Sequence, residues 1–139
     1  MERYKVIFDT NLWISLLIGK RLATLEEVCG DSRFAVYLCS ELAAEFEDVV
    51  SRPKINKYAQ SNSIAYVKRL MEDACITAEI TITATSDVRD NKDLYLLSLA
   101  DSIDADFIVS GDKDLLTLQQ YNRTQILSFS DFMLLRKAL

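Results

Sequence analysis

The chain has 139 residues, a formal net charge of −5, 50% hydrophobic side chains and no histidine. The missing imidazole excludes catalysis of the Ser-His-Asp and Cys-His types, and zinc sites that depend on histidine ligands. Acid–base or metal chemistry is therefore expected to depend mainly on the 21 Asp and Glu side chains. The length fits one domain that spans residues 1–139.

Short apolar runs alternate with helical spacings along the chain. The pattern predicts a strand at 6–8, helices over 12–17 and 23–29, a strand at 34–38, a helix over 41–51 that Ser40 caps, and a helix over 64–74. There follow a strand at 80–83, a polar loop at 86–92, a helix over 93–103, a strand at 107–109, a helix over 115–118, a strand at 125–129 and a helix that Ser130 caps. This alternation predicts an α/β fold around a mainly parallel five-stranded sheet, with helices on both faces and the strand order 3-2-1-4-5.

The cysteines and the apolar runs bear on the cellular compartment. Cys29, Cys39 and Cys75 are an odd number at wide spacing, which favours free, mostly buried thiols in a reducing compartment. The apolar run after Lys5 is far shorter than the ~18 residues that a membrane helix needs. We therefore expect a soluble cytoplasmic protein with no membrane segment. Trp13 is expected in the core, where aromatic side chains are commonly buried.

Acidic residues follow the ends of the predicted parallel strands. Asp9 comes directly after the first strand and Asp112 directly after the fourth, and these two strands are neighbours in the expected order. Asp93 opens the helix after the third strand, and Glu45 lies one turn into the helix after the second. Binding crevices of open α/β sheets lie beyond the carboxyl ends of the strands, where the strand order reverses. We therefore expect these four side chains to face one pocket.

Four carboxylates in one pocket need compensation, because two like charges ~4 Å apart repel by about 4 kcal/mol at an effective dielectric constant of about 20. Either some of the carboxyl groups stay protonated, or a metal ion fills the site. Oxygen ligands of this kind suit Mg²⁺ or Mn²⁺. Such an ion is suited to phosphodiester hydrolysis, because it activates water and stabilises the leaving oxygen. Any one of these acids alone is more commonly a helix cap, so the hypothesis rests on their combination.

Three segments together resemble the PIN-domain nucleases. They read VIFDTNLWIS at residues 6–15, EFEDVVSRPK at 45–54, and RDNKD at 89–93 with ADFIVSGDKDLL at 105–116. The middle segment looks like the branch that supplies the toxins of bacterial toxin–antitoxin pairs. The resemblance implies the three-layer α/β/α sandwich of PIN domains and metal-dependent cleavage of single-stranded RNA.

The resemblance also implies roles for individual residues. The family's four catalytic, metal-binding acids correspond to Asp9, Glu45, Asp93 and Asp112. Asp114 matches a further acid that some members use near the metal. Asn11 and Ser110 match supporting polar positions.

Two of the acids have competitors. Where the family more often reads Asp-Pro-Lys-Asp-Asn, this chain has Asn91 and Leu94 in the places of the proline and the last asparagine, which leaves a choice between Asp90 and Asp93. The following Tyr-Leu-Leu favours Asp93, because it stands at the family's spacing. Glu41, one turn before Glu45, is a lesser competitor for the second acid.

Other functions stay open at this point. The main alternative is a PIN-like module that binds RNA or protein without cutting, because a complete set of acids does not prove turnover. A phosphatase of the dehalogenase type is disfavoured, since it needs a second aspartate where Asn11 stands. By resemblance, the partners are a single-stranded RNA substrate, a cognate antitoxin protein and a second copy in a homodimer. An isoelectric point near 4.7 is unusual for a nucleic-acid-binding protein, and bound cations would offset the acids locally. No RNA-binding residue is assigned.

Overall fold

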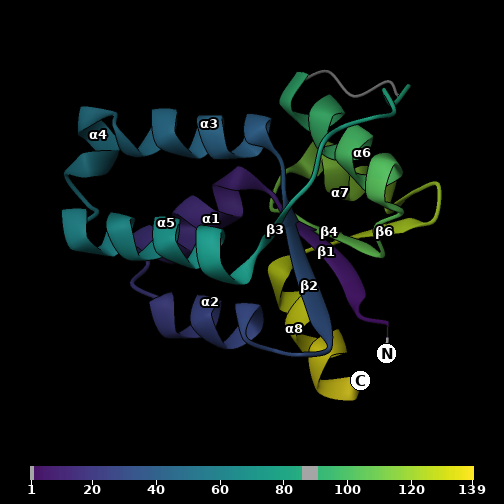
Figure 1. Cartoon of the computed structure of the whole chain (residues 1–139), viewed down its shortest axis with the longest axis horizontal. Helices are drawn as coiled ribbons and strands as arrows, with labels where there is room; N and C mark the ends of the chain where they lie inside the picture. The colour runs from purple at the N-terminus through teal and green to yellow at the C-terminus, as the bar shows by residue number, and fades with distance from the viewer. Residues whose placement is uncertain (1, 86–90) are drawn as a thin grey trace.

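The central sheet of the computed structural model has the strand order β3-β2-β1-β4-β6-β5, and the structure describes residues 2–85 and 91–139 (Figure 1). The strands are β1 (Tyr4–Phe8), β2 (Phe34–Leu38), β3 (Ile76–Thr77), β4 (Phe107–Val109), β5 (Gln120–Tyr121) and β6 (Thr124–Leu127). All neighbouring pairs are parallel except β5 and β6. The α/β fold and the predicted parallel order are therefore confirmed, with β6 in the place of the fifth strand.

The helices lie on both faces of this sheet (Figure 1). They are α1 (Thr10–Ile18), α2 (Leu22–Cys29), α3 (Ser40–Val50), α4 (Pro53–Asn56), α5 (Ser61–Ala74), α6 (Asn91–Ile103), α7 (Lys113–Leu118) and α8 (Phe129–Ala138). The sequence pattern did not predict α4, a single turn with proline at its start. Ser128 caps α8 in place of Ser130, and Cys39 stands at the cap position of α3 in place of Ser40.

The sixth strand corrects the prediction of five. β5 and β6 form a hairpin in which Tyr121 pairs with Thr124, so its loop has the two residues Asn122 and Arg123. Asn122 has φ 53°, a left-handed conformation that asparagine adopts more readily than most residues. A strand of two residues carries too little alternation to be predicted from its side chains.

The third strand was predicted at the wrong place. Residues 80–83 alternate as a strand would, yet β3 lies earlier, at Ile76–Thr77. The backbone N–H groups of Thr81 and Ile82 donate to the hydroxyl of Ser102, and that of Ala84 donates to Ser98. Helix α6 therefore binds the backbone groups that a neighbouring strand would otherwise satisfy.

Aromatic rings attach the last helix to the sheet. Phe132 of α8 makes edge contacts with Phe8, Phe34 and Phe107, at centroid distances of 5.7, 5.4 and 6.3 Å. Trp13 also makes an edge contact with Phe8, at a centroid distance of 5.7 Å, and is fully buried, as expected. Burial of such large rings contributes strongly to stability, so this cluster holds β1, and the residue that follows it, in place.

Two further expectations can be compared with the structure. The three cysteines are free; Cys29 and Cys39 are buried, and Cys75 is half-buried. Within residues 2–85 and 91–139, no helix has the length and apolar character needed to cross a membrane.

Candidate metal centre

The carboxyl ends of β1 and β4 bring Asp9 and Asp112 to the same edge of the sheet. The two strands pair in parallel with Phe8 opposite Val109, so the chain leaves both at one level. Each aspartate then caps a helix: Asp9 Oδ1 accepts from the N–H of Asn11 (3.3 Å), and Asp112 Oδ1 accepts from the N–H of Asp114 (2.8 Å). Helix capping therefore orients both carboxylates at the strand ends.

One buried hydroxyl links these two aspartates. Ser110 Oγ donates to Asp9 Oδ2 (2.7 Å) and accepts from the backbone N–H of Asp112 (3.0 Å). The donor and the acceptor of both hydrogen bonds are unambiguous, because a carboxylate only accepts and an N–H only donates. Ser110 is 1% exposed and Asp9 is 5% exposed, so this arrangement lies largely out of water, where such hydrogen bonds are strongest.

Asp112 and two further carboxylates form a group that could hold a metal ion. One carboxylate oxygen from each of Asp93, Asp112 and Asp114 lies within 4.8 Å of the other two. Asp93 stands in the first turn of α6 and is 3% exposed, Asp112 is half-buried, and Asp114 is exposed in the first turn of α7. Oxygens around one Mg²⁺ at ~2.1 Å are separated by about 3–4 Å, so small side-chain adjustments would suffice. Exclusively oxygen donors suit Mg²⁺ or Mn²⁺.

Glu45 is bound by a tyrosine of α6, the helix that carries Asp93. Tyr95 Oη, on α6, donates to Glu45 Oε2 on α3 (3.3 Å) and lies 3.1 Å from Thr10 Oγ1 at the start of α1. Burial, chiefly, raises the pKa of Tyr95 well above its ordinary value; Thr10 opposes this by hydrogen bonding, and the charges of Glu45 and Asp9 add to it. Tyr95 therefore stays protonated and serves as a hydrogen-bond donor at ordinary pH.

Some of the predicted acids belong to the candidate metal-binding group, and others lie outside it. Asp93, Asp112 and Asp114 form the group itself. Asp9 is linked to Asp112 through Ser110, whereas Glu45 accepts from Tyr95, two residues after Asp93 on α6. The competitor Glu41 accepts from the Ser40 hydroxyl at the start of α3. Asp90, the other candidate for the third acid, lies outside the described residues.

The two predicted supporting residues, Ser110 and Asn11, differ in how they contact Asp9. Ser110 contacts Asp9 directly, as a supporting residue would. Asn11 has an exposed side chain and contacts Asp9 through its backbone N–H. Sequence reasoning missed Thr10 and Tyr95. The sequence offered only a weak signal for them. Thr10 stands one position after Asp9 and Tyr95 two positions after Asp93, but many surface residues with a hydroxyl group also stand that close to an acid.

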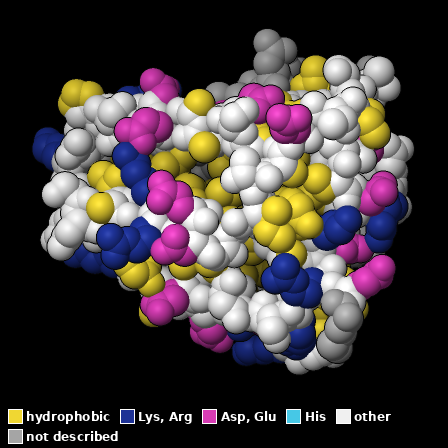
Figure 2. Space-filling model, in the orientation of Figure 1, with side chains coloured by type: hydrophobic (Ala, Val, Ile, Leu, Met, Phe, Trp, Pro, Cys, Tyr) yellow, Lys and Arg dark blue, Asp and Glu magenta, His cyan; other side chains and the backbone are white. Residues whose placement is uncertain are grey.

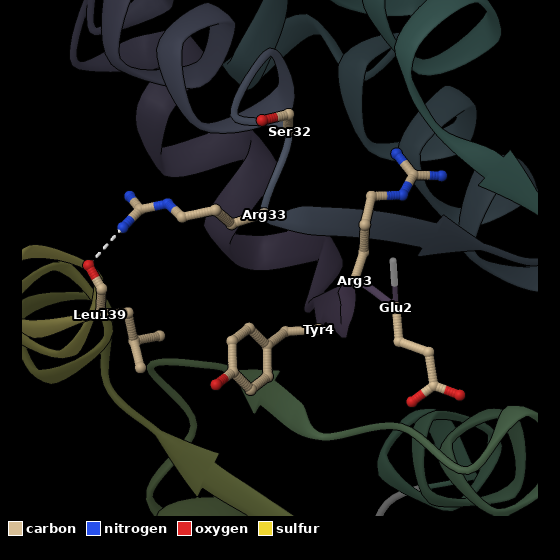
Figure 3. A pocket seen from close by; sticks show the side chains of 6 residues that line it. All are labelled: Glu2, Arg3, Tyr4, Ser32, Arg33 and Leu139. Atoms are coloured by element: carbon tan, nitrogen blue, oxygen red, sulfur yellow. Dashed lines mark hydrogen bonds between the residues drawn. The ribbon is translucent and has the colours of Figure 1, made fainter.

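A hollow at the opposite edge of the sheet has a different character. It has a volume of about 430 Å³ and is lined by Arg3, Tyr4, Arg33 and Leu139, among others (Figure 3). Arg33 is already bound there, to the backbone oxygen of Leu139 (2.7 Å) and to Asp31. The hollow lies at the amino ends of β1 and β2, whereas sites in parallel sheets form at the carboxyl ends. We therefore place the candidate site at the acids.

The model of a family described as PIN domain matches residues 5–114. That range begins in β1 and ends at Asp114, so it contains every acid of the candidate centre. No curated protein matches the chain.

Proposed function

The chain belongs to the PIN domain family, and we propose from this premise that it is a metal-dependent endoribonuclease that cuts single-stranded RNA. PIN domains are generally nucleases and use divalent metal ions. The observation that carries the proposal is the group of Asp93, Asp112 and Asp114, whose oxygens lie within 4.8 Å of one another at the carboxyl edge of the sheet.

The residues of the chain divide the work in a definite way. Asp93, Asp112 and Asp114 would hold Mg²⁺ or Mn²⁺ through one oxygen each. A bound ion of this kind lowers the pKa of its water and stabilises the leaving oxygen of a phosphodiester. Ser110 donates to Asp9 and links it to the backbone of Asp112, one of these ligands, and Tyr95 donates to Glu45. The proposed centre therefore needs no histidine, in agreement with the composition.

The surface charge suits a nuclease whose affinity depends on the metal. The chain carries a net charge of −5, and on the face seen in Figure 2 basic side chains are scattered among acidic ones. Contacts between Lys or Arg and phosphates normally supply most of the non-specific affinity for nucleic acid. Because the centre itself is lined by carboxylates, phosphate binding there would depend on a bound cation.

A toxin role within a toxin–antitoxin pair is the finer part of the proposal. The support is the resemblance of residues 45–54 to that branch of the family. Under this proposal the protein works in the cytoplasm as a homodimer and is held by a cognate antitoxin protein. Growth arrest on expression of the wild-type chain, absent for an Asp112→Asn variant, would support this role; normal growth with active enzyme would contradict it.

The decisive experiment is cleavage of a labelled single-stranded RNA with Mn²⁺ or Mg²⁺, and with EDTA. Asp93→Asn is expected to lower the rate ~100-fold or more, because a metal site supplies several kcal/mol of transition-state stabilisation. Asp101→Asn is the matched control. It makes the same change on the same helix, about 12 Å further along the axis, where Asp101 accepts a hydrogen bond from Asn122.

Each outcome of this experiment decides a specific point. Cutting that EDTA abolishes, and that the control variant retains, supports the nuclease and its site. Cleavage that persists in EDTA overturns the metal mechanism. RNA binding by a folded, Mn²⁺-loaded protein without cutting favours a PIN-like module that binds RNA. Equal cutting of single-stranded DNA of the same sequence would leave a nuclease but overturn the RNA preference.

A further inference from the structure

Three helices meet at the hydroxyl group of Tyr95. Tyr95 belongs to α6, Glu45 to the middle of α3, and Thr10 is the first residue of α1. Helices α1 and α3 lie side by side (Figure 1). The tyrosine hydroxyl contacts Glu45 Oε2 at 3.3 Å and Thr10 Oγ1 at 3.1 Å. One group therefore connects the helix that carries Asp93 with the helix that carries Glu45 and with the residue next to Asp9.

The donors and acceptors of this contact have one consistent arrangement. Tyr95 donates its single hydrogen to Glu45, since a carboxylate only accepts. The hydrogen between Tyr95 and Thr10 must then come from Thr10. Thr10 is fully buried, and the β-branched side chain of threonine has few rotamers, so its hydroxyl is held in place. Thr10 therefore orients Tyr95, and Tyr95 orients Glu45.

The Glu45 side chain needs a hydrogen-bond partner to keep one orientation. A free glutamate side chain on a helix samples many rotamers, and fixing one of them costs conformational entropy. Glu45 is half-buried on α3, and its Oε2 accepts a hydrogen bond from the hydroxyl of Tyr95, a residue that is itself half-buried. Residues that orient ligands around a metal typically change affinity or activity by about 10–100-fold when removed.

We propose that Tyr95 is a positioning residue, which holds the Glu45 carboxylate in an orientation from which it contributes to metal binding at the acidic group. The proposal rests on the nuclease function proposed above, because the metal would occupy that same centre. In this role the hydroxyl group of Tyr95 orients Glu45, and Glu45 in turn contributes to metal binding. The aromatic ring of Tyr95 has a different role, since it packs against the hydrophobic core.

The test uses Tyr95→Phe, which keeps the ring and removes the hydroxyl. Mn²⁺ binding to the whole chain without RNA is measured by calorimetry or by electron paramagnetic resonance. We expect the Mn²⁺ dissociation constant to rise about tenfold. Tyr66→Phe is the matched control, because it removes an equivalent tyrosine–glutamate hydrogen bond, from Tyr66 to Glu26 (2.7 Å), on α5 and α2.

A double-mutant cycle separates positioning from a general effect on folding. In a Glu45→Ala background, Tyr95→Phe is expected to leave the Mn²⁺ dissociation constant unchanged, because the residue through which it acts is gone. An equal loss in both backgrounds would overturn the proposal, as would wild-type Mn²⁺ affinity in Tyr95→Phe. RNA cleavage by the wild type is a separate readout: its absence would contradict the nuclease function and leave the effect of Tyr95 on Mn²⁺ binding to be judged by itself.

Discussion

At the scale of single residues, the hydroxyl of Ser110 has more influence on the candidate centre than its size suggests. It supplies a hydrogen to the buried carboxylate of Asp9 and accepts one from the backbone of Asp112. A buried carboxylate that loses a donor is costly, because water cannot replace the lost hydrogen bond. Ser110 therefore helps the strand pairing and the helix caps to fix the Asp9 carboxylate relative to Asp112.

Replacement of Ser110 tests that role. Ser110→Ala is expected to lower the free energy of unfolding by about 1–3 kcal/mol and to weaken Mn²⁺ binding about tenfold or more. Urea denaturation and a Mn²⁺ titration measure the two effects. Ser110→Thr keeps the hydroxyl and is expected to retain most of the affinity. Unchanged Mn²⁺ binding in the alanine variant would show that Asp9 needs no such orientation.

At the scale of elements, helix α6 contributes residues to the candidate centre and also binds the segment that follows β3. One of its ends carries Asp93 and Tyr95, which belong to the candidate centre. Further along, Ser98 and Ser102 each donate to a backbone oxygen one turn earlier and accept from the segment that follows β3. The alternation at residues 80–83 resembles a strand, but its partner is the side of this helix.

Because the two serines bind different backbone N–H groups, replacing one of them tests these contacts while the other serves as a control. Ser102→Ala removes the acceptor for the N–H groups of Thr81 and Ile82. A hydrogen bond is worth about 1 kcal/mol net, so amide hydrogen exchange at these two positions should speed up about fivefold. Ala84 is the internal control, because its N–H donates to Ser98. Equal acceleration at all three amides, or at none, would contradict the assignment.

At the scale of the whole molecule, an ion-pair cluster joins the C-terminal helix to the turn before β2. Asp31 accepts from Arg33 (2.7 Å) and from Arg136 of α8 (2.9 Å), and Arg136 also reaches Glu27 (3.2 Å). The hydrogen bonds from Arg33, chiefly, hold the pKa of Asp31 well below its ordinary value, while burial opposes this. The side chains of Asp31 and Arg136 are 9% and 13% exposed, so solvent screens this pair less than a surface pair.

This cluster makes stability depend on pH with a definite sign. Because the folded pKa of Asp31 is depressed, its contribution is present above the unfolded pKa of about 3.9 and is lost as pH falls below it. Asp31→Asn is expected to lower the free energy of unfolding by about 1–2 kcal/mol at pH 7, with the two proteins converging in acid. Asp48→Asn, in an exposed pair with Arg52, should change little. Denaturant unfolding measures the difference, and a deficit in Asp31→Asn that does not shrink as the pH falls from about 4 to about 2 would contradict this account.

The sequence by itself determined those features that depend on neighbouring residues. The apolar runs of β1, β2 and β4 are local patterns, and they predicted the parallel centre of the sheet with its order. Asp9 and Asp112 follow strands directly, so the prediction that they lie at one edge needed only the strand order. The resemblance of three segments likewise predicted the family, which the match over residues 5–114 confirms.

Tertiary structure alone decided the contacts between distant residues. Tyr95 lies 85 positions from Thr10 and 50 from Glu45, and their hydrogen bonds depend on how α6 packs against α1 and α3. The same holds for β3, because the backbone at residues 80–83 binds serine side chains of α6 in place of a strand. Local propensity acts over a few residues, whereas these choices are made by packing and hydrogen-bond satisfaction across the whole chain.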